Sequence, residues 1–142
     1  MSAPALQVEH LRTHFFTRQG VVKAVDGVSF EIGAGRILGL VGESGSGKTV
    51  TGFSILGLVD PPGRIVDGRI VLEGQDLARL DAEALRRVRG NRIAMIFQDP
   101  MMTLNPVLRI DTQMIEAVQA HAQVSREAAL ARAREALVRV GI

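Results

Sequence analysis

The sequence predicts an α/β protein in which a small antiparallel β-sheet adjoins a parallel αβ core and helices follow. Three observations support this prediction. Apolar and polar residues alternate loosely over residues 6–32, as in half-buried strands. A short apolar run, Arg36–Val41, precedes a glycine-rich loop and an apolar helical stretch, the order of strand, loop and helix. Two stretches with helical spacing and helix-capping residues end the chain.

The antiparallel sheet is expected to consist of several short strands. Strands are predicted at Leu6–His14, Val21–Val25 and Val28–Ile32, with turns at Gln19-Gly20 and near Asp26-Gly27. Further along, Asp67-Gly68 favours a tight hairpin between Ile65–Val66 and Arg69–Leu72.

The remaining elements follow from apolar runs and capping residues. After the glycine-rich loop, an apolar helical face is formed by Val50, Phe53, Ile55, Leu56 and Leu58, and Asp60-Pro61-Pro62-Gly63 ends it. Asp81 caps a helix over Ala82–Arg89 that Gly90 ends, and Ile93–Phe97 reads as a second buried strand. A polar loop over Gln98–Pro106 precedes helices at Thr112–Gln123 and Arg126–Val140, the second with Ser125 as N-cap and Gly141 as C-cap.

Residues 42–49 read GESGSGKT and match the phosphate-binding pattern G-x-x-x-x-G-K-[ST] at Gly42, Gly47, Lys48 and Thr49. Glycines allow a backbone in which successive N–H groups point inward at crowded phosphate oxygens. The start of the following helix adds unpaired N–H groups and a positive dipole end. Lys48 supplies a full positive charge at the β- and γ-phosphates, and the Thr49 hydroxyl can ligate Mg²⁺. The loop therefore predicts a nucleotide site.

Composition excludes several classes of protein. A chain of 142 residues suits one domain, and it has no cysteine for disulfides, thiol chemistry or Cys-type zinc sites. No apolar run approaches the roughly eighteen residues of a membrane span. Residues 1–9 do not resemble a signal peptide. The net charge of +2 gives no reason to expect nucleic-acid binding.

A second functional position is expected where residues 93–99 read IAMIFQD. A nucleotide hydrolase needs a group at the end of a neighbouring strand that reaches Mg²⁺ or the attacking water. Gln98 and Asp99 both satisfy this requirement, and the alternation of a strand would let only one of them face the site. The chemistry of the residues leaves both open.

The loop GESGSGKT together with Met95–Pro106, MIFQDPMMTLNP, resembles the ATP-binding subunits of ABC transporters, and within them the oligopeptide/dipeptide importers. Val21–Ser29 and Ile70–Leu77 also resemble that family. The resemblance implies a P-loop NTPase core with an antiparallel β subdomain and the start of a helical subdomain, truncated after its first part. Residues 1–36 and 64–77 would be mainly antiparallel β, residues 37–60 and 92–98 the P-loop core, and residues 99–142 the Q-loop and the start of the helical subdomain.

The resemblance also assigns roles to residues. ATP and Mg²⁺ are the expected cofactors. The expected nucleotide-binding residues are Gly42, Glu43, Ser44, Gly45, Ser46, Gly47, Lys48 and Thr49, with Phe16, or alternatively Phe15, stacking on adenine. Lys48 and Gln98 are the expected catalytic residues, and Thr49 and Gln98 the expected metal ligands. Gln98 corresponds to the Q-loop glutamine, which resolves the choice against Asp99. The loop Asp99–Pro106 resembles the surface on which a helix of the membrane partner docks.

The function implied is an ATPase subunit that couples ATP binding and hydrolysis to import of a solute, with peptide as the expected class. Its partners would be transmembrane permease subunits and a second ATPase subunit, with no nucleic acid. The location would be the cytoplasmic face of the inner membrane, peripherally and through protein. The chain has no LSGGQ-type signature and no Walker B Asp followed by Glu. We therefore expect it to be the amino-terminal part of a longer subunit, inactive alone. Alternative functions are a soluble ABC-type ATPase, a GTPase and a small-molecule kinase.

Overall fold

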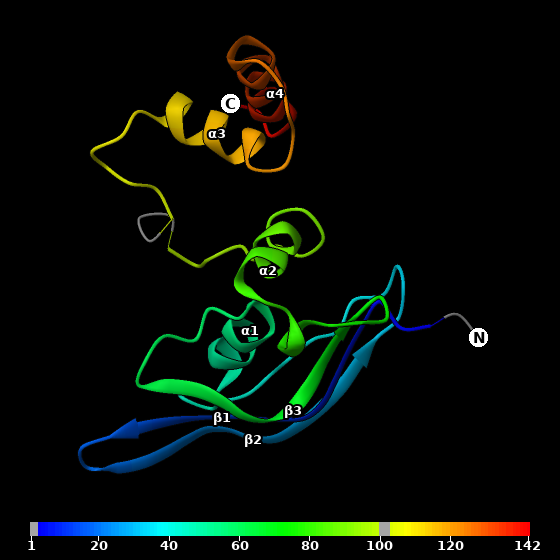
Figure 1. Cartoon of the computed structure of the whole chain (residues 1–142), viewed down its shortest axis with the longest axis vertical. Coiled ribbons are helices and arrows are strands. Elements are labelled where there is room, and N and C mark those ends of the chain that lie inside the picture. Colours follow the sequence, from blue (N-terminus) through cyan, green and yellow to red (C-terminus); the bar gives the residue numbers. More distant parts are fainter. Residues whose placement is uncertain (1–2, 100–102) are drawn as a thin grey trace. The chain divides into compact units, whose positions relative to one another are not determined.

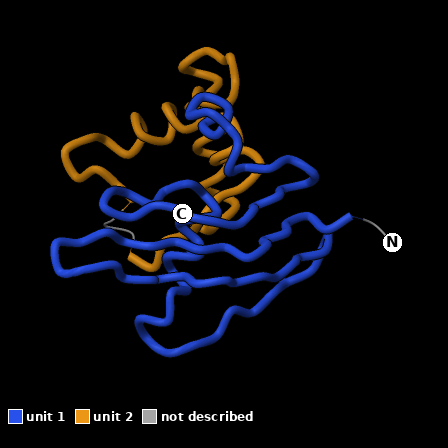
Figure 2. Tube along the Cα trace, turned by 60° about the horizontal axis from the view of Figure 1, so that its bottom comes forward, with its two compact units in different colours: residues 1–86 blue, residues 87–142 orange. Residues whose placement is uncertain are grey.

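The computed structural model describes residues 3–99 and 103–142, which form two compact units, residues 1–86 and 87–142 (Figures 1 and 2). The first unit holds the β-sheet, the glycine-rich loop of residues 42–49 and the helix that follows it. The second unit holds two helices and the segment that leads to them.

The first unit is built on one antiparallel sheet. Its strands are β1 (Leu6–Thr17), β2 (Gly20–Ile32), β3 (Gly63–Leu72) and β4 (Gln75–Asp76), in the order β2-β1-β3-β4. The antiparallel sheet predicted from alternation is therefore confirmed. It is made of fewer and longer strands than expected.

A β-bulge keeps the apolar side chains of β1 on one face. Leu6 and Val8 are buried, and so are Leu11 and Thr13, although an odd spacing separates the two pairs. Without an inserted residue, the second pair would face the opposite side of the sheet. The pairing register with both neighbouring strands shifts between residues 8 and 12, and His10 takes a φ of 48° there.

The predicted hairpin at Asp67-Gly68 and the predicted turn near Asp26-Gly27 are both wrong, because β3 and β2 run through these dipeptides without interruption. Gly68 takes a φ of 102° opposite the bulge of β1, where a Cβ would lie 2.6 Å from the Cα of Leu11. A glycine in such a sequence can mark a tight turn, but it can also mark a place where two strands approach each other closely. The hairpin instead turns at Glu73 and Gly74, which both have positive φ.

Helix α1 (Lys48–Leu56) follows the glycine-rich loop, as predicted, and covers one face of the sheet (Figure 1). It ends earlier than expected, because Gly57 takes the left-handed conformation and leaves Leu58 outside the helix.

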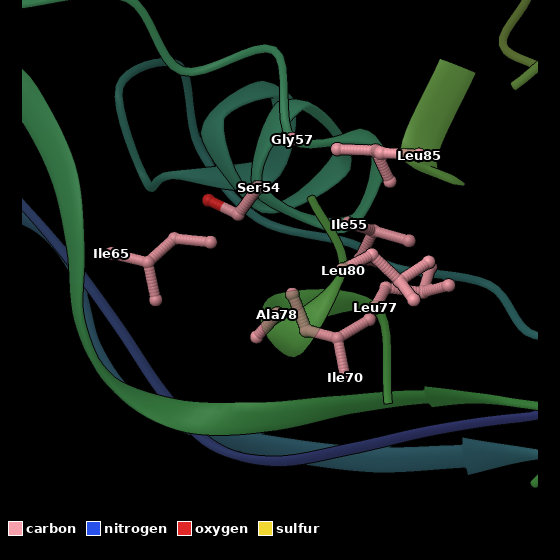
Figure 3. Close-up of a pocket in the computed structure, with 9 residues that line it drawn as sticks. All are labelled: Ser54, Ile55, Gly57, Ile65, Ile70, Leu77, Ala78, Leu80 and Leu85. Atoms are coloured by element: carbon pink, nitrogen blue, oxygen red, sulfur yellow. The ribbon is translucent and has the colours of Figure 1, made fainter. Parts of the chain in front are cut away.

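The 3-10 turn η1 (Leu77–Arg79) and helix α2 (Ala82–Val88) follow β4. Asp81 accepts a hydrogen bond from the Ala84 N–H at 2.7 Å, so the predicted cap is confirmed. An apolar cavity of about 150 Å³ lies in this unit. Figure 3 shows the residues that line it, which are Ser54, Ile55, Gly57, Ile65, Ile70, Leu77, Ala78, Leu80 and Leu85.

The two buried core strands predicted at Arg36–Val41 and Ile93–Phe97 are not present among the strands of the described residues. Ile37, Val41 and Ile96 are more than 90% exposed. A parallel core strand is stabilised by strands on either side and by helices on both faces. In the described ranges, no second sheet provides these neighbours, and only an isolated bridge between Arg89 and Ile93 forms nearby. Apolar runs of this kind therefore adopt strand structure only with their partners.

The second unit contains α3 (Ile110–Gln119) and α4 (Arg126–Arg139), which pack through Ile115, Ala129 and Ala133. Helix α3 begins and ends earlier than the predicted Thr112–Gln123. Helix α4 agrees with its prediction to within a residue, and the Ser125 side chain accepts from the Ala128 N–H as N-cap. No helix in the described part of the chain is long and apolar enough to cross a bilayer.

Candidate functional site

The glycines of residues 42–49 shape the loop that leads into α1. Gly45 and Gly47 have φ values of 82° and 92°, a region that other L-residues rarely adopt. A Cβ on Gly47 would also collide with the carbonyl oxygen of Ala24 in β2. Gly47 is the residue immediately before α1, so a side chain has no room at this position between the start of the helix and β2.

Lys48 folds back over the loop that precedes it. Its ammonium Nζ donates to the carbonyl oxygens of Gly42 and Glu43 at 2.7 Å each and to the Ser46 hydroxyl at 3.2 Å. A Cβ on Gly42 would lie 2.6 Å from that hydroxyl oxygen, so a side chain there would displace Ser46. The Ser46 N–H donates to the Glu43 carbonyl at 3.2 Å and closes the turn. The structure therefore brings a positive charge to the centre of the loop.

The start of α1 is held in place by side chains on its buried face. The Thr51 hydroxyl donates to the Gly47 carbonyl at 2.9 Å. One turn further, Ser54 is hydrogen-bonded to Thr13 of β1 at 2.7 Å. Sequence reasoning missed both residues. The only hint was a polar pair, three residues apart, on an otherwise apolar helical face.

These residues fit a polyphosphate. The first turn of α1 carries N–H groups that have no partner within the helix, and it contains no acidic residue to repel an anion. Glu43, Ser44 and Thr49 are exposed. Nowhere in the described residues do three or more His, Cys, Asp or Glu side chains group to hold a metal ion. A cation here would therefore depend on hydroxyl, amide and phosphate oxygens, a donor set that Mg²⁺ accepts.

The two phenylalanines of β1 lie on opposite faces of the sheet, since neighbouring residues of a strand alternate. Phe16 is 39% exposed, and the Arg64 guanidinium lies 4.2 Å from the centre of its ring. Phe15 is half-buried and shares the face of Thr13, which contacts α1. Its ring lies against Gly63, where a Cβ would approach Phe15 Cε1 to 2.6 Å.

Gln98 and Asp99 lie in the second unit, and both are exposed. Because residues 93–97 form no strand, the alternation that was expected to place only one of them toward the site does not apply. The choice of Gln98 over Asp99 therefore remains a prediction. The neighbouring Pro100, Met101 and Met102 fall outside the described residues.

Comparison with known proteins places the chain in a family. The family model described as "ABC transporter" matches residues 25–142. The chain belongs to the ABC transporter family. The resemblance noted from GESGSGKT and MIFQDPMMTLNP is thereby confirmed at the level of the family.

Curated relatives in this family carry names from peptide transport. A probable peptide ABC transporter ATP-binding protein of Sinorhizobium fredii is 48% identical over 93% of the chain and 40% of its own length. The oligopeptide transport ATP-binding protein AppD of Bacillus subtilis is 46% identical over 96% of the chain and 42% of its own length. The chain thus spans about two fifths of the length of these ABC relatives.

Solved structures support the fold. The dimeric structure of MJ0796, a bacterial ABC transporter cassette, matches with a TM-score of 0.79 at 22% identity, over 93% of this chain and 55% of that one. A post-hydrolysis state of the MJ0796 cassette bound to ADP and Pi matches with a TM-score of 0.76 at 21% identity. The predicted fold class, an ABC ATPase-type α/β arrangement, is confirmed by these likenesses.

Proposed function

We propose that the chain binds the triphosphate of ATP in the loop of residues 42–49. The observation that carries this proposal is the position of the Lys48 ammonium, which reaches two loop carbonyls and the Ser46 hydroxyl. Phosphate oxygens are stronger acceptors for an ammonium than neutral carbonyls, so Lys48 would transfer its hydrogen bonds to the nucleotide. The N–H groups of Gly45, Gly47 and the first turn of α1 complete the cradle.

For the metal, we propose Thr49 and Gln98 as the protein ligands of Mg²⁺. Thr49 is the second residue of α1, and its exposed hydroxyl can approach a cation held by the phosphates. When bound, the cation would neutralise phosphate charge, while Lys48 and Gln98 orient the phosphate and the attacking water.

For adenine, we propose stacking on Phe16, with Phe15 as the alternative. The exposure of the Phe16 ring favours it, because a base needs an accessible ring face. The position of Phe15 on the α1 face of the sheet favours the alternative.

The function that these sites support is an ATP-binding subunit that drives solute import, with peptide as the solute class by the names of the relatives. Its partners would be permease subunits, contacted through the Q-loop region that begins at Gln98, and a second ATPase subunit. It would sit peripherally at the cytoplasmic face of the inner membrane. In this proposal residues 1–36 and 64–77 are the mainly antiparallel β part, residues 37–60 and 92–98 are the P-loop core, and residues 99–142 are the Q-loop and the start of the helical subdomain.

Calorimetric titration of the chain with ATP and Mg²⁺ tests the nucleotide site. The chain has two lysines, which allows a matched comparison. Lys48→Ala should weaken ATP binding about 10- to 100-fold, the loss expected for charge-assisted hydrogen bonds. Lys23→Ala should leave binding unchanged, because Lys23 lies on β2 and pairs with Asp26 at 3.5 Å. Equal affinities of the two variants would contradict the proposal.

A further inference from the structure

The carbonyl of Gly47, the last residue before α1, is held by two hydrogen bonds from one residue. The Thr51 N–H donates to it at 2.8 Å, and the Thr51 hydroxyl donates to it at 2.9 Å. A carbonyl oxygen has two lone pairs, so these two bonds use its full capacity as an acceptor. Thr51 is only 4% exposed, so water has little access to the hydroxyl.

Gly47 is also confined on its other side. Its φ of 92° lies in the left-handed region, and a Cβ there would collide with the Ala24 carbonyl of β2. The Cα of Gly47 therefore lies against β2 while its carbonyl is bound to Thr51. The peptide plane that joins Gly47 to Lys48 is thus fixed at two places.

The orientation of this plane decides where the Lys48 N–H points. The peptide is trans, and in a trans peptide the N–H and C=O groups point in opposite directions. The Gly47 carbonyl points along α1 toward Thr51, so the Lys48 N–H points back, out of the start of the helix. The first N–H groups of a helix have no acceptor within it, and an anion placed there accepts from them. The Lys48 ammonium also reaches back over the loop, so both donors of this residue serve the same place.

We propose that Thr51 is a positioning residue for phosphate binding, because its hydroxyl fixes the Gly47–Lys48 peptide and so aims the Lys48 N–H at the phosphate before the nucleotide arrives. This inference rests on the proposed nucleotide site and adds a residue beyond the pattern G-x-x-x-x-G-K-[ST], which ends at Thr49. A donor that is already oriented loses less conformational freedom when the ligand binds. Thr51 acts through Gly47 and does not itself contact the phosphate.

Calorimetric titration of the chain with inorganic triphosphate and Mg²⁺ is the first test. Thr51→Val keeps the branched shape of the side chain and removes the hydroxyl. It should weaken triphosphate binding about 3- to 10-fold, the change that corresponds to one hydrogen bond of typical net strength. Thr51→Ser keeps the hydroxyl and should bind as the wild type does. Equal affinities of Thr51→Val and the wild type would overturn the proposal.

Thermal unfolding separates positioning from support of the fold. After Thr51→Val, the Gly47 carbonyl still accepts from the N–H of residue 51, so the melting temperature should stay within about 2 °C of the wild type. Thr13→Val is the matched control, because it removes a buried threonine hydroxyl of the same unit that bonds to Ser54. It should lower the melting temperature without changing triphosphate affinity. Affinity that falls in step with melting temperature across these variants would indicate support of the fold alone and would overturn the proposal.

The backbone amide of Lys48 gives a direct readout of the orientation. The chain has two lysines, so isotopic labelling of lysine nitrogen yields two backbone amide signals in an NMR spectrum, from Lys23 and Lys48. Saturating triphosphate should shift the Lys48 amide proton in the wild type and shift it less in Thr51→Val. The Lys23 signal, from β2, should not move. Equal shifts of the Lys48 proton in the two proteins would show that the N–H is oriented without the hydroxyl, against the proposal.

The outcomes separate the two proposals. If the wild type binds no triphosphate, the proposed nucleotide site fails and the role of Thr51 falls with it. If the wild type binds triphosphate, Lys48→Ala weakens binding and Thr51→Val does not, the nucleotide site stands and the role of Thr51 alone is overturned.

Discussion

Thr13 of β1 donates a buried hydrogen bond to Ser54 of α1, with 2.7 Å between the two hydroxyl oxygens. The direction follows from a proton count. Each hydroxyl has one proton, and the proton of Ser54 is already used, because its Oγ donates to the Val50 carbonyl at 2.7 Å. Thr13 must therefore be the donor. This hydrogen bond joins the sheet to α1, the helix that begins at the glycine-rich loop.

The first prediction concerns this pair. Ser54→Ala leaves the buried Thr13 hydroxyl without an acceptor and should lower the free energy of unfolding by about 1–3 kcal/mol. Thr13→Val removes the donor but leaves Ser54 bonded to Val50, so it should cost less. The double variant should be more stable than the sum of the two single losses predicts, because no unsatisfied hydroxyl remains. Urea unfolding of the four proteins measures the coupling, and strict additivity would contradict the directed bond.

The second prediction separates backbone strain from steric collision in the loop. Gly45 and Gly47 both have positive φ, but a Cβ on Gly45 meets nothing within 4 Å, whereas one on Gly47 strikes the Ala24 carbonyl. Gly45→Ala should therefore cost only the strain of the left-handed conformation, about 1 kcal/mol. Gly47→Ala should cost clearly more, and it should weaken ATP binding because the start of α1 must shift. Thermal unfolding and calorimetry compare the two, and equal losses would show that the contact with β2 is unimportant.

Local chemistry explains which parts of the site the sequence could predict. The loop over Gly42–Thr49, the start of α1 and the caps Asp81 and Ser125 depend on residues close together in the chain, and all were predicted correctly as elements. The pattern also places Lys48 directly after the last glycine of the loop, and in the structure its ammonium reaches back to the loop carbonyls.

Long-range packing explains what could not be predicted. The bond between Thr13 and Ser54 joins residues 41 positions apart, and nothing local marks it. The dipeptide Asp67-Gly68 suits a turn, yet the approach of Leu11 on the neighbouring strand places it inside β3. The apolar run at Arg36–Val41 specifies burial but not its partners, and in the described residues it stays unpaired.

The third prediction identifies the aromatic residue for adenine. Phe16→Ala should weaken ATP binding about tenfold, within the range for a base stacked on an aromatic ring, while binding of inorganic triphosphate stays the same. Phe15→Ala serves as the comparison, since Phe15 lies on the other face of the same strand. Because triphosphate has no base, the ratio of the two affinities isolates the stacking contribution. A change in that ratio only for Phe15→Ala would assign adenine to Phe15 instead.

The fourth prediction concerns acid. The hydrogen bonds from Arg109 lower the pKa of Asp111 below its usual value of 3.8, aided by the Thr112 N–H. A carboxyl whose pKa is lowered by folding stabilises the fold above its ordinary pKa and loses this effect as pH falls through the lowered value. The contribution of this ion pair should therefore be present from neutral pH down to about pH 4 and be lost below it. Carbon NMR titration of the Asp111 carboxyl should give a midpoint below that of the unfolded chain, and Arg109→Gln should move it upward. A midpoint that does not respond to Arg109→Gln would show that the ion pair does not form in solution.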